Sequence, residues 1–121
     1  MVSQREGPLP DEMKPSQAEL LRIEARYNGA EAVITAEGEL AITTAARFLA
    51  CVREALVTSP SSINVDAHAL TFADSSGLSA LLRARGLAHD AGVAFRISSP
   101  SPKLRRLVER TGTKDYLVPD E

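Results

Sequence analysis

The segment of this sequence with the greatest potential for chemistry is Thr71–Leu78, which reads TFADSSGL. Two serine hydroxyls stand where an apolar, strand-like stretch gives way to a helical pattern, and Asp74 precedes them. Backbone N–H groups at the N-terminus of a helix lack intrahelical partners, and the helix dipole favours negative charge there. A phosphate added to Ser76 would bring roughly −1.5 to −2 charges and three acceptor oxygens. The end of the helix could therefore hold a phosphate on Ser76 without unfolding the domain.

Two other interpretations of these serines are open. Serine is a common N-cap, so Ser75 or Ser76 could simply begin the helix while Asp74 closes a turn. Alternatively, Ser76 could act as a catalytic nucleophile, which requires a base within hydrogen-bond reach. His68 and His89 are the only histidines, and the segment lacks the Gly-x-Ser-x-Gly pattern of a nucleophile elbow. We expect no enzyme activity.

Composition excludes several classes of protein. The chain has 121 residues, which suits one domain, and 44% of them are hydrophobic. Its formal net charge of −2 argues against nucleic acid as the main partner. No apolar run approaches the roughly 20 residues of a membrane span, and the polar N-terminus lacks a signal-peptide core, so we expect a cytoplasmic protein without a membrane partner.

The sequence also gives no indication of a cofactor or a metal. Cys51 is the single cysteine, which excludes an internal disulfide and a multi-cysteine metal site. It falls in an apolar helical pattern, and we expect it to be a small core side chain. No P-loop and no convergent cluster of His, Asp and Glu is present.

Apolar periodicity divides the chain into elements. Residues 1–17 contain three prolines and mostly polar residues, and are expected to form a mobile N-terminal tail before a domain at 18–121. Alternating apolar and polar residues predict five strands, at 21–27, 30–36, 63–67, 93–98 and 115–118. Apolar stripes predict three helices. The first follows Thr43 or Thr44, the second begins near Ser75 or Ser76, and the third follows the Ser-Pro segment at 99–102.

The resulting order, β-β-α-β-α-β-α-β, predicts an α/β fold. Asn28-Gly29 suits a tight turn, so the first two strands are expected to form an antiparallel hairpin. The later alternation of strands and helices favours parallel pairing with right-handed crossovers. The sheet is therefore expected to be a mixed β-sheet. Polar alternate positions in the first and fourth strands predict helices mainly on one face.

Three segments of the chain resemble STAS domains of the anti-sigma-factor antagonist family. The Asp-Ser-Ser-Gly-Leu turn at 74–78, with a Phe two residues before the Asp, is similar to the family's phosphorylation loop. Gly-Glu-Leu at 38–40 followed by Thr44-Ala45 resembles the segment after its hairpin. Ser99-Pro100, followed by a Lys-Leu-Arg-Arg-Leu helix ending in Thr-Gly, resembles the segment before its last strand. The resemblance covers about residues 19–118.

The resemblance implies a STAS fold and a partner-switching cycle. In that cycle the unmodified protein binds an anti-sigma factor that is also a serine kinase, and so frees a sigma factor. The kinase phosphorylates the second serine of the loop, which corresponds to Ser76, and a metal-dependent serine phosphatase reverses the change. ATP, metal and catalytic residues belong to these partners. This chain would need no cofactor, and would be a monomer or a weak homodimer.

We also expect a binding face around Ser76, because the flanking loops leave the same ends of their strands, where open α/β sheets place their sites. We expect Asp74 and Ser75 to shape the loop and Gly77 to let a partner backbone approach. Four residues on the flanking loops are expected to complete the face: Leu40, Ala41, Thr44 and Ser99. Ala41 departs from the family, because many members carry an acidic residue there. Many members also add a final helix where this chain has Pro119-Asp120-Glu121.

A second function is compatible with the same fold. STAS domains also serve as non-switching adaptors or as regulatory subunits of scaffolds and lipid-transport complexes. Basic residues on two predicted helices are expected to be solvated, to form a docking rim for an acidic partner, or to neutralise a phosphate on Ser76: Arg83, Arg85, Lys103, Arg105, Arg106 and Arg110.

Overall fold

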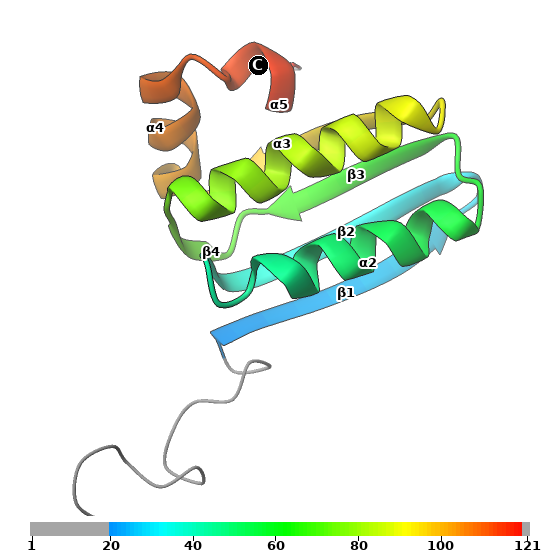
Figure 1. Cartoon of the computed structure of the whole chain (residues 1–121), viewed down its shortest axis with the longest axis horizontal. Helices are drawn as coiled ribbons and strands as arrows, with labels where there is room; N and C mark the ends of the chain where they lie inside the picture. Colours follow the sequence, from blue (N-terminus) through cyan, green and yellow to red (C-terminus); the bar gives the residue numbers. More distant parts are fainter. Residues whose placement is uncertain (1–19, 120–121) are drawn as a thin grey trace, which may run out of the picture.

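The computed structural model describes residues 20–119 (Figure 1). The predicted N-terminal tail, 1–17, lies outside the described residues. The strands are β1 (Leu21–Asn28), β2 (Glu31–Leu40), β3 (Ser62–Ala67), β4 (Leu70–Ala73) and β5 (Ala94–Pro100). The helices are α2 (Ala45–Val57), α3 (Ser75–Asp90), α4 (Pro102–Thr111) and α5 (Lys114–Leu117).

The first two strands form the predicted hairpin. β1 and β2 pair antiparallel from Leu21↔Gly38 to Asn28↔Glu31. Gly29 sits in the turn with φ of 64°, a left-handed conformation that glycine adopts without steric cost. β2 is the longer strand, and its two halves pair with different strands on its other side. It is the centre of the sheet.

The remaining strands extend the sheet by parallel pairing. The order along the sheet is β1-β2-β3-β5, with β4 pairing to β2 beyond the end of β3. β3 pairs with residues 31–35 of β2, and β4 pairs with residues 38–40. The mixed β-sheet and the α/β fold class predicted from the sequence are confirmed.

The core lies between the sheet and the two longest helices. Alternate residues of β2 and β3 point into it: Ala32, Ile34, Ala36, Ile63, Val65 and Ala67. α2 and α3 lie side by side on this face of the sheet, while α4 and α5 gather near the ends of β4 and β5 (Figure 1). The predicted placement of the helices mainly on one face is confirmed.

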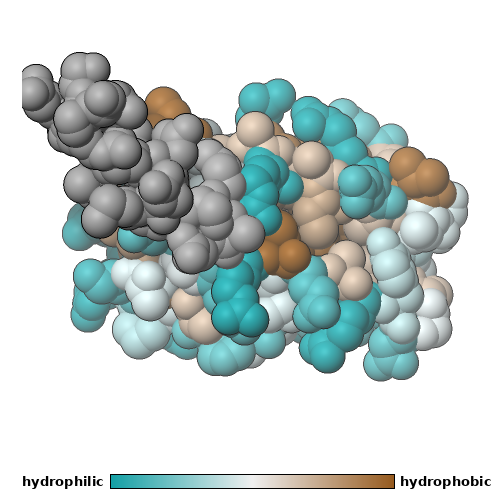
Figure 2. Space-filling view, turned by 90° about the horizontal axis from the view of Figure 1, so that it is seen from below, coloured by the Kyte–Doolittle hydropathy of each residue, from teal (hydrophilic) through white to brown (hydrophobic). Residues whose placement is uncertain are grey.

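The opposite face of the sheet carries polar side chains. Ser62, Asn64 and Asp66 of β3 are partly exposed there, and Arg96 of β5 reaches Glu31 of β2 at 3.5 Å. Seen from the side of β1, the surface is mainly hydrophilic, with apolar side chains in small separate patches (Figure 2).

The predicted strand at 115–118 is wrong, because this segment is the short helix α5. Leu117 and Val118 are consecutive and both buried. A strand would send consecutive side chains to opposite faces, whereas a helical turn lets both pack inward. The carbonyl of Thr113 accepts hydrogen bonds from the backbone N–H groups of Tyr116 and Leu117.

A second local difference is β4, which the sequence analysis treated as a connection. Its register skips Thr71, because Gly38 pairs with Leu70 whereas Glu39 pairs with Phe72. This β-bulge reverses which face the following residues point to. The Thr71 hydroxyl donates a hydrogen bond to the carbonyl of Gly38 at 3.2 Å, which holds the bulge against β2.

Within residues 20–119, no helix is both long enough and apolar enough to span a lipid bilayer.

The start of α4 gives a test of the fold. Ser101 is buried, and its hydroxyl accepts a hydrogen bond from the N–H of Leu104 at 3.2 Å. Ser101→Ala should therefore lower the free energy of unfolding by about 1 kcal/mol, the usual cost of losing an N-cap. Urea denaturation of both proteins measures the difference. Exposed Ser99→Ala is the matched control, and an equal loss in both variants would contradict the capping role.

Candidate functional site

The candidate site lies where β2 and β4 end and α2 and α3 begin. Leu40 and Ala73, the last residues of these two strands, are in register with each other. The segments that follow, 41–44 and 74–76, therefore leave the sheet side by side. Sites of open α/β sheets commonly lie outside the carboxyl ends of parallel strands.

Asp74, rather than a serine, caps α3. Its carboxylate oxygen Oδ1 accepts a hydrogen bond from the backbone N–H of Gly77 at 3.0 Å, and its carbonyl accepts one from Leu78 at 2.9 Å. Ser75 and Ser76 are the first two residues inside the helix. The capping interpretation of the two serines is therefore wrong, because a serine cap would have to stand one position earlier.

The side chains of Ser75 and Ser76 take no part in the hydrogen bonding of the described fold. Ser75 is exposed and Ser76 is half-buried. Among residues 20–119, neither hydroxyl has a hydrogen-bond partner. Ser76 therefore presents a hydroxyl at the first turn of a 16-residue helix, with the carboxylate of Asp74 two positions before it.

Gly77 allows close contact within the chain itself. It is buried, and a Cβ atom placed on it would lie 2.1 Å from the carbonyl oxygen of Leu40. Only a residue without a side chain fits this approach, since real Cβ atoms do not come so near an oxygen. The predicted close approach at Gly77 is thus made by β2 of the same molecule, and contact with a partner backbone stays a prediction.

The loop between β2 and α2 is held from inside. The hydroxyl of Thr44, fully buried, donates to the carbonyl of Glu39 at 2.8 Å and accepts from the N–H of Ala41 at 3.0 Å. It bonds the loop and no N–H of the helix that follows. Leu40 is also fully buried. Of the three residues in this region that were predicted to meet a partner, only half-buried Ala41 reaches the surface, whereas Leu40 and Thr44 lie beneath it.

Two exposed apolar side chains stand on the segments next to the serine turn, and the sequence analysis did not assign either to the site. Ile42 is 77% exposed, and Phe72 is 43% exposed. Phe72 is exposed because the bulge at Thr71 pairs it with exposed Glu39, whereas Ala73 pairs with buried Leu40. Apolarity at a loop tip was the signal for Ile42, but no sequence pattern indicated the bulge.

Ser99 lies farther along the sheet. It is exposed, and it is in register with Asp66 of β3. The residues after β5 that contact the region of β4 belong to α4. A groove of about 220 Å³ between them is lined by Phe72, Ala73, Lys103, Arg106, Leu107 and Arg110.

The match to a known family agrees with this architecture. A family model described as "Mlab, STAS domain" matches residues 23–119. This chain belongs to the STAS domain family. The STAS domain suggested by the three sequence segments is thereby confirmed, and the role of an anti-sigma-factor antagonist stays a prediction. The described residues 20–119 correspond closely to the matched range.

Solved structures show the same STAS fold at low sequence identity. An anti-sigma factor antagonist from Mycobacterium paratuberculosis has a TM-score of 0.72 and 21% identity, over 80% of this chain and 82% of that one. The phosphorylated form of the Bacillus cell fate determinant SpoIIAA has a TM-score of 0.62 and 21% identity, over 81% of this chain and 88% of that one. A sulfate transporter family protein from Wolinella succinogenes has a TM-score of 0.67 and 18% identity, over 78% of this chain and 77% of that one. No curated protein matches the chain.

His68 of the STAS domain is engaged by a carboxylate. Its Nδ1 lies 2.7 Å from Oδ1 of Asp66. This hydrogen bond and the charge of Asp66 raise the pKa of His68. Desolvation acts to raise the pKa of Asp66, but the hydrogen bonds from the ring and backbone of His68 outweigh it and leave that pKa lowered. The partner of His68 is thus Asp66, and a role as base for Ser76 gains no support.

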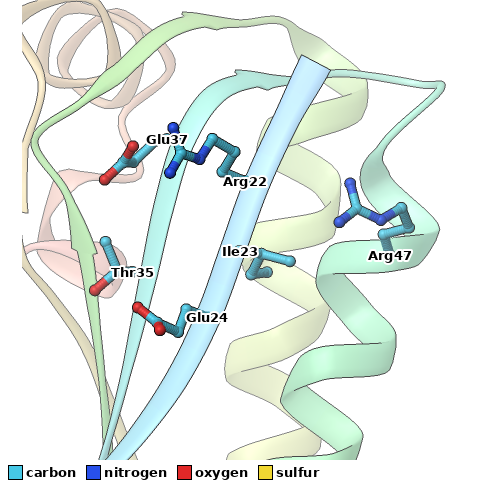
Figure 3. Close-up of a pocket in the computed structure, with 6 residues that line it drawn as sticks. All are labelled: Arg22, Ile23, Glu24, Thr35, Glu37 and Arg47. Atoms are coloured by element: carbon cyan, nitrogen blue, oxygen red, sulfur yellow. The ribbon is translucent and has the colours of Figure 1, made fainter. Parts of the chain in front are cut away.

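The hollow in Figure 3 lies at the edge of the sheet beside β1 and shares no residue with the Ser76 loop. Arg22 and Glu37 stand in register across the two strands, and Arg47 approaches from α2. Glu24 balances the remaining positive charge, so the lining favours neither anions nor cations. Nη1 of Arg47 already donates to the carbonyl of Leu21 at 2.7 Å.

Candidates for metal or thiol chemistry are weak. The described part of the chain contains no group of three or more His, Cys, Asp and Glu side chains that could hold a metal ion. Cys51 packs against the core, as predicted from the sequence, but it is half-buried and not a fully buried core residue. Burial raises the pKa of its thiol, and the charge of Glu54 adds to this effect. A raised pKa disfavours the reactive thiolate.

The contact between Gly77 and Leu40 can be tested within one helix. Gly77→Ala should lower the free energy of unfolding by about 1–3 kcal/mol, because the new methyl group has to displace the backbone of β2. Gly86→Ala is the matched control, since the added Cβ would meet nothing within 4 Å apart from its chain neighbours and the nearby backbone of its own helix. That control should be neutral or stabilising by up to about 1 kcal/mol. Equal urea midpoints for the two variants would contradict the contact.

The division between Asp74 and Ser76 gives a second test. Asp74→Ala should lower the free energy of unfolding by about 1 kcal/mol through loss of the helix cap. Ser76→Ala should change it by less than about 0.5 kcal/mol, since the hydroxyl has no structural partner. Asp74→Asn keeps an acceptor oxygen and should recover most of the loss. If Ser76→Ala lowered the free energy of unfolding more than Asp74→Ala does, Ser76 and not Asp74 would be the helix cap.

Proposed function

We propose that this STAS domain is an anti-sigma-factor antagonist that is switched off by phosphorylation on Ser76. In this proposal the unmodified domain binds an anti-sigma factor with serine kinase activity, and a metal-dependent serine phosphatase restores the unmodified form. The observation that carries the proposal is the cap of α3. Because Asp74 caps the helix, the Ser76 hydroxyl is available for modification without loss of the fold.

The surroundings of Ser76 support release by a phosphate. Ile42 and Phe72 expose apolar surface on the segments next to the Ser76 turn, as expected for the core of a protein interface. Phosphate on Ser76 would add its charge close to the carboxylate of Asp74. Bringing these charges into an interface without pairing them costs free energy, so a partner that covers the apolar residues would dissociate.

The chemistry of the switch requires little of this chain. The hydroxyl oxygen of Ser76 attacks the γ-phosphorus of ATP held by the kinase, the bond to the β-phosphate oxygen breaks, and the serine proton goes to a base of the kinase. Residues 20–119 then supply a positioned hydroxyl and a docking surface. In this proposal the protein acts in the cytoplasm and is not an enzyme.

A second candidate function is a non-switching adaptor or regulatory subunit. The structural likeness to the sulfate transporter family protein and the description of the matching family model favour it. In that case Ser76 would be a contact residue, and no phosphate would be added. Phosphate transfer to Ser76 therefore separates the two functions.

The proposal predicts that wild-type protein retains an ATP-binding serine kinase from lysate of the native organism, while Ser76→Asp does not. The added carboxylate stands for part of the phosphate charge and leaves the cap of α3 intact. Quantitative mass spectrometry of the captured proteins measures the ratio. Ser75→Asp is the matched control at the neighbouring exposed position, and it should retain more of the kinase than Ser76→Asp.

The captured kinase then provides the decisive assay. With ATP and magnesium it should phosphorylate wild-type protein and Ser75→Ala, but not Ser76→Ala. Transfer to Ser76→Ala at the wild-type rate would refute Ser76 as the acceptor. Capture of the same partners by wild type and Ser76→Asp, without any phosphate transfer, would favour the adaptor.

A further inference from the structure

A groove between β4 and α4 adjoins the Ser76 turn. Its lining residues are Phe72 and Ala73 of β4 and Lys103, Arg106, Leu107 and Arg110 of α4. Ala73 directly precedes Asp74, so the groove begins one residue before the turn that carries the serines. The groove has a volume of about 220 Å³.

The apolar part of the groove is made by Phe72 and Leu107. The bulge at Thr71 turns Phe72 out of the core and leaves it 43% exposed. Leu107 is buried beneath the surface of α4. An exposed aromatic side chain beside a groove is a typical anchor point for an apolar side chain of a partner.

The rim of the groove is positively charged. Lys103, Arg106 and Arg110 are spaced by three and four residues, which places them on one face of α4. The residues that line the groove include no acidic side chain. None of the three cations forms an ion pair with another residue in the range 20–119. The rim therefore carries three positive charges that the fold does not use.

The dimensions favour an extended peptide. Seven residues of helix rise about 10 Å from the first cation to the last. A segment of about three residues in extended conformation spans the same length. Arginine pairs well with carboxylates because its donors match their two oxygens. A nucleic acid would need a wider basic surface than one face of a ten-residue helix in a protein of net charge −2.

We propose that this groove binds an acidic, extended segment of the partner protein, with one apolar side chain seated on Phe72. This inference rests on the proposed function in one respect only, namely that the segment belongs to the protein that reads Ser76. Charge complementarity identifies the class of ligand, and the groove remains present whichever form of Ser76 faces the partner.

The proposal is tested with a probe peptide of stated sequence, acetyl-Glu-Leu-Glu-Asp-Leu-Glu-amide, titrated into the ¹⁵N-labelled full chain. Amide shifts should concentrate at Phe72, Ala73 and residues 103–110. The double variant Lys103→Glu/Arg106→Glu should weaken binding by at least about tenfold. Raising NaCl from about 0.05 to about 0.3 M should weaken it several-fold, because the rim charges are screened.

Matched controls separate the charge from the apolar anchor. Arg53→Glu reverses an exposed cation on α2 and should leave the peptide affinity unchanged within a factor of about two. Phe72→Ser, or serine in place of both leucines of the peptide, should weaken binding several-fold. The folded state of each variant is checked in the same NMR spectra.

Three outcomes would overturn the inference. They are absence of shifts at about 1 mM peptide, shifts centred away from the groove, and tighter binding of a single-stranded oligonucleotide to the same residues. The outcome does not depend on phosphate transfer. If the peptide does not bind but Ser76 is phosphorylated, only the proposal for the groove is refuted. If the peptide binds but Ser76 is not phosphorylated, only the proposed phosphorylation switch is refuted.

Discussion

The contact between the first turn of α3 and the carbonyl end of β2 determines the geometry of the site. Gly77 has no side chain, so the carbonyl of Leu40 can lie where a Cβ atom would otherwise be. The pairing of Leu40 with Ala73 fixes the same two segments from the sheet side. Both constraints act on Leu40, and they fix Ala73 and Gly77 on either side of the serines. A hydroxyl positioned in this way can be presented to another protein without a search through loop conformations.

Structural and exposed groups are separated residue by residue around this contact. Asp74, Thr44 and Ser101 each satisfy backbone groups of a helix start or of a loop. The side chains of Ser76 and Ile42 satisfy no backbone group, although Ser76 is two residues from Asp74 and Ile42 is two residues from Thr44. Exposed groups that have no role in folding and that stand near one another are natural contact points for a partner.

The predictable parts of this fold are those specified by local pattern. Alternation identified the hairpin and the buried strands, and the DSSG turn pointed to the end of the sheet where the candidate site lies. The missed parts depend on register and on packing. A one-residue bulge at Thr71 exposes Phe72, and no composition signal marks it. The sequence analysis assigned Leu40 and Thr44 to the binding face because their loop lies near Ser76, but both side chains are buried. The helix α5 replaces a strand because Leu117 and Val118 must both be buried.

The opposite charges of two adjacent surfaces bear on how a small domain can be both bound and released. The Ser76 turn already carries the carboxylate of Asp74, and the proposed phosphate would increase that negative charge. The groove one residue away carries three cations. A partner that used the turn alone would lose all affinity on phosphorylation, and one that used the groove alone would not sense it. A partner that touches both would keep part of its attraction while the contact at Ile42 and Ser76 is lost. Such a partial loss matches the requirement of a reversible cycle, in which the modified protein must still meet the enzymes that act on it.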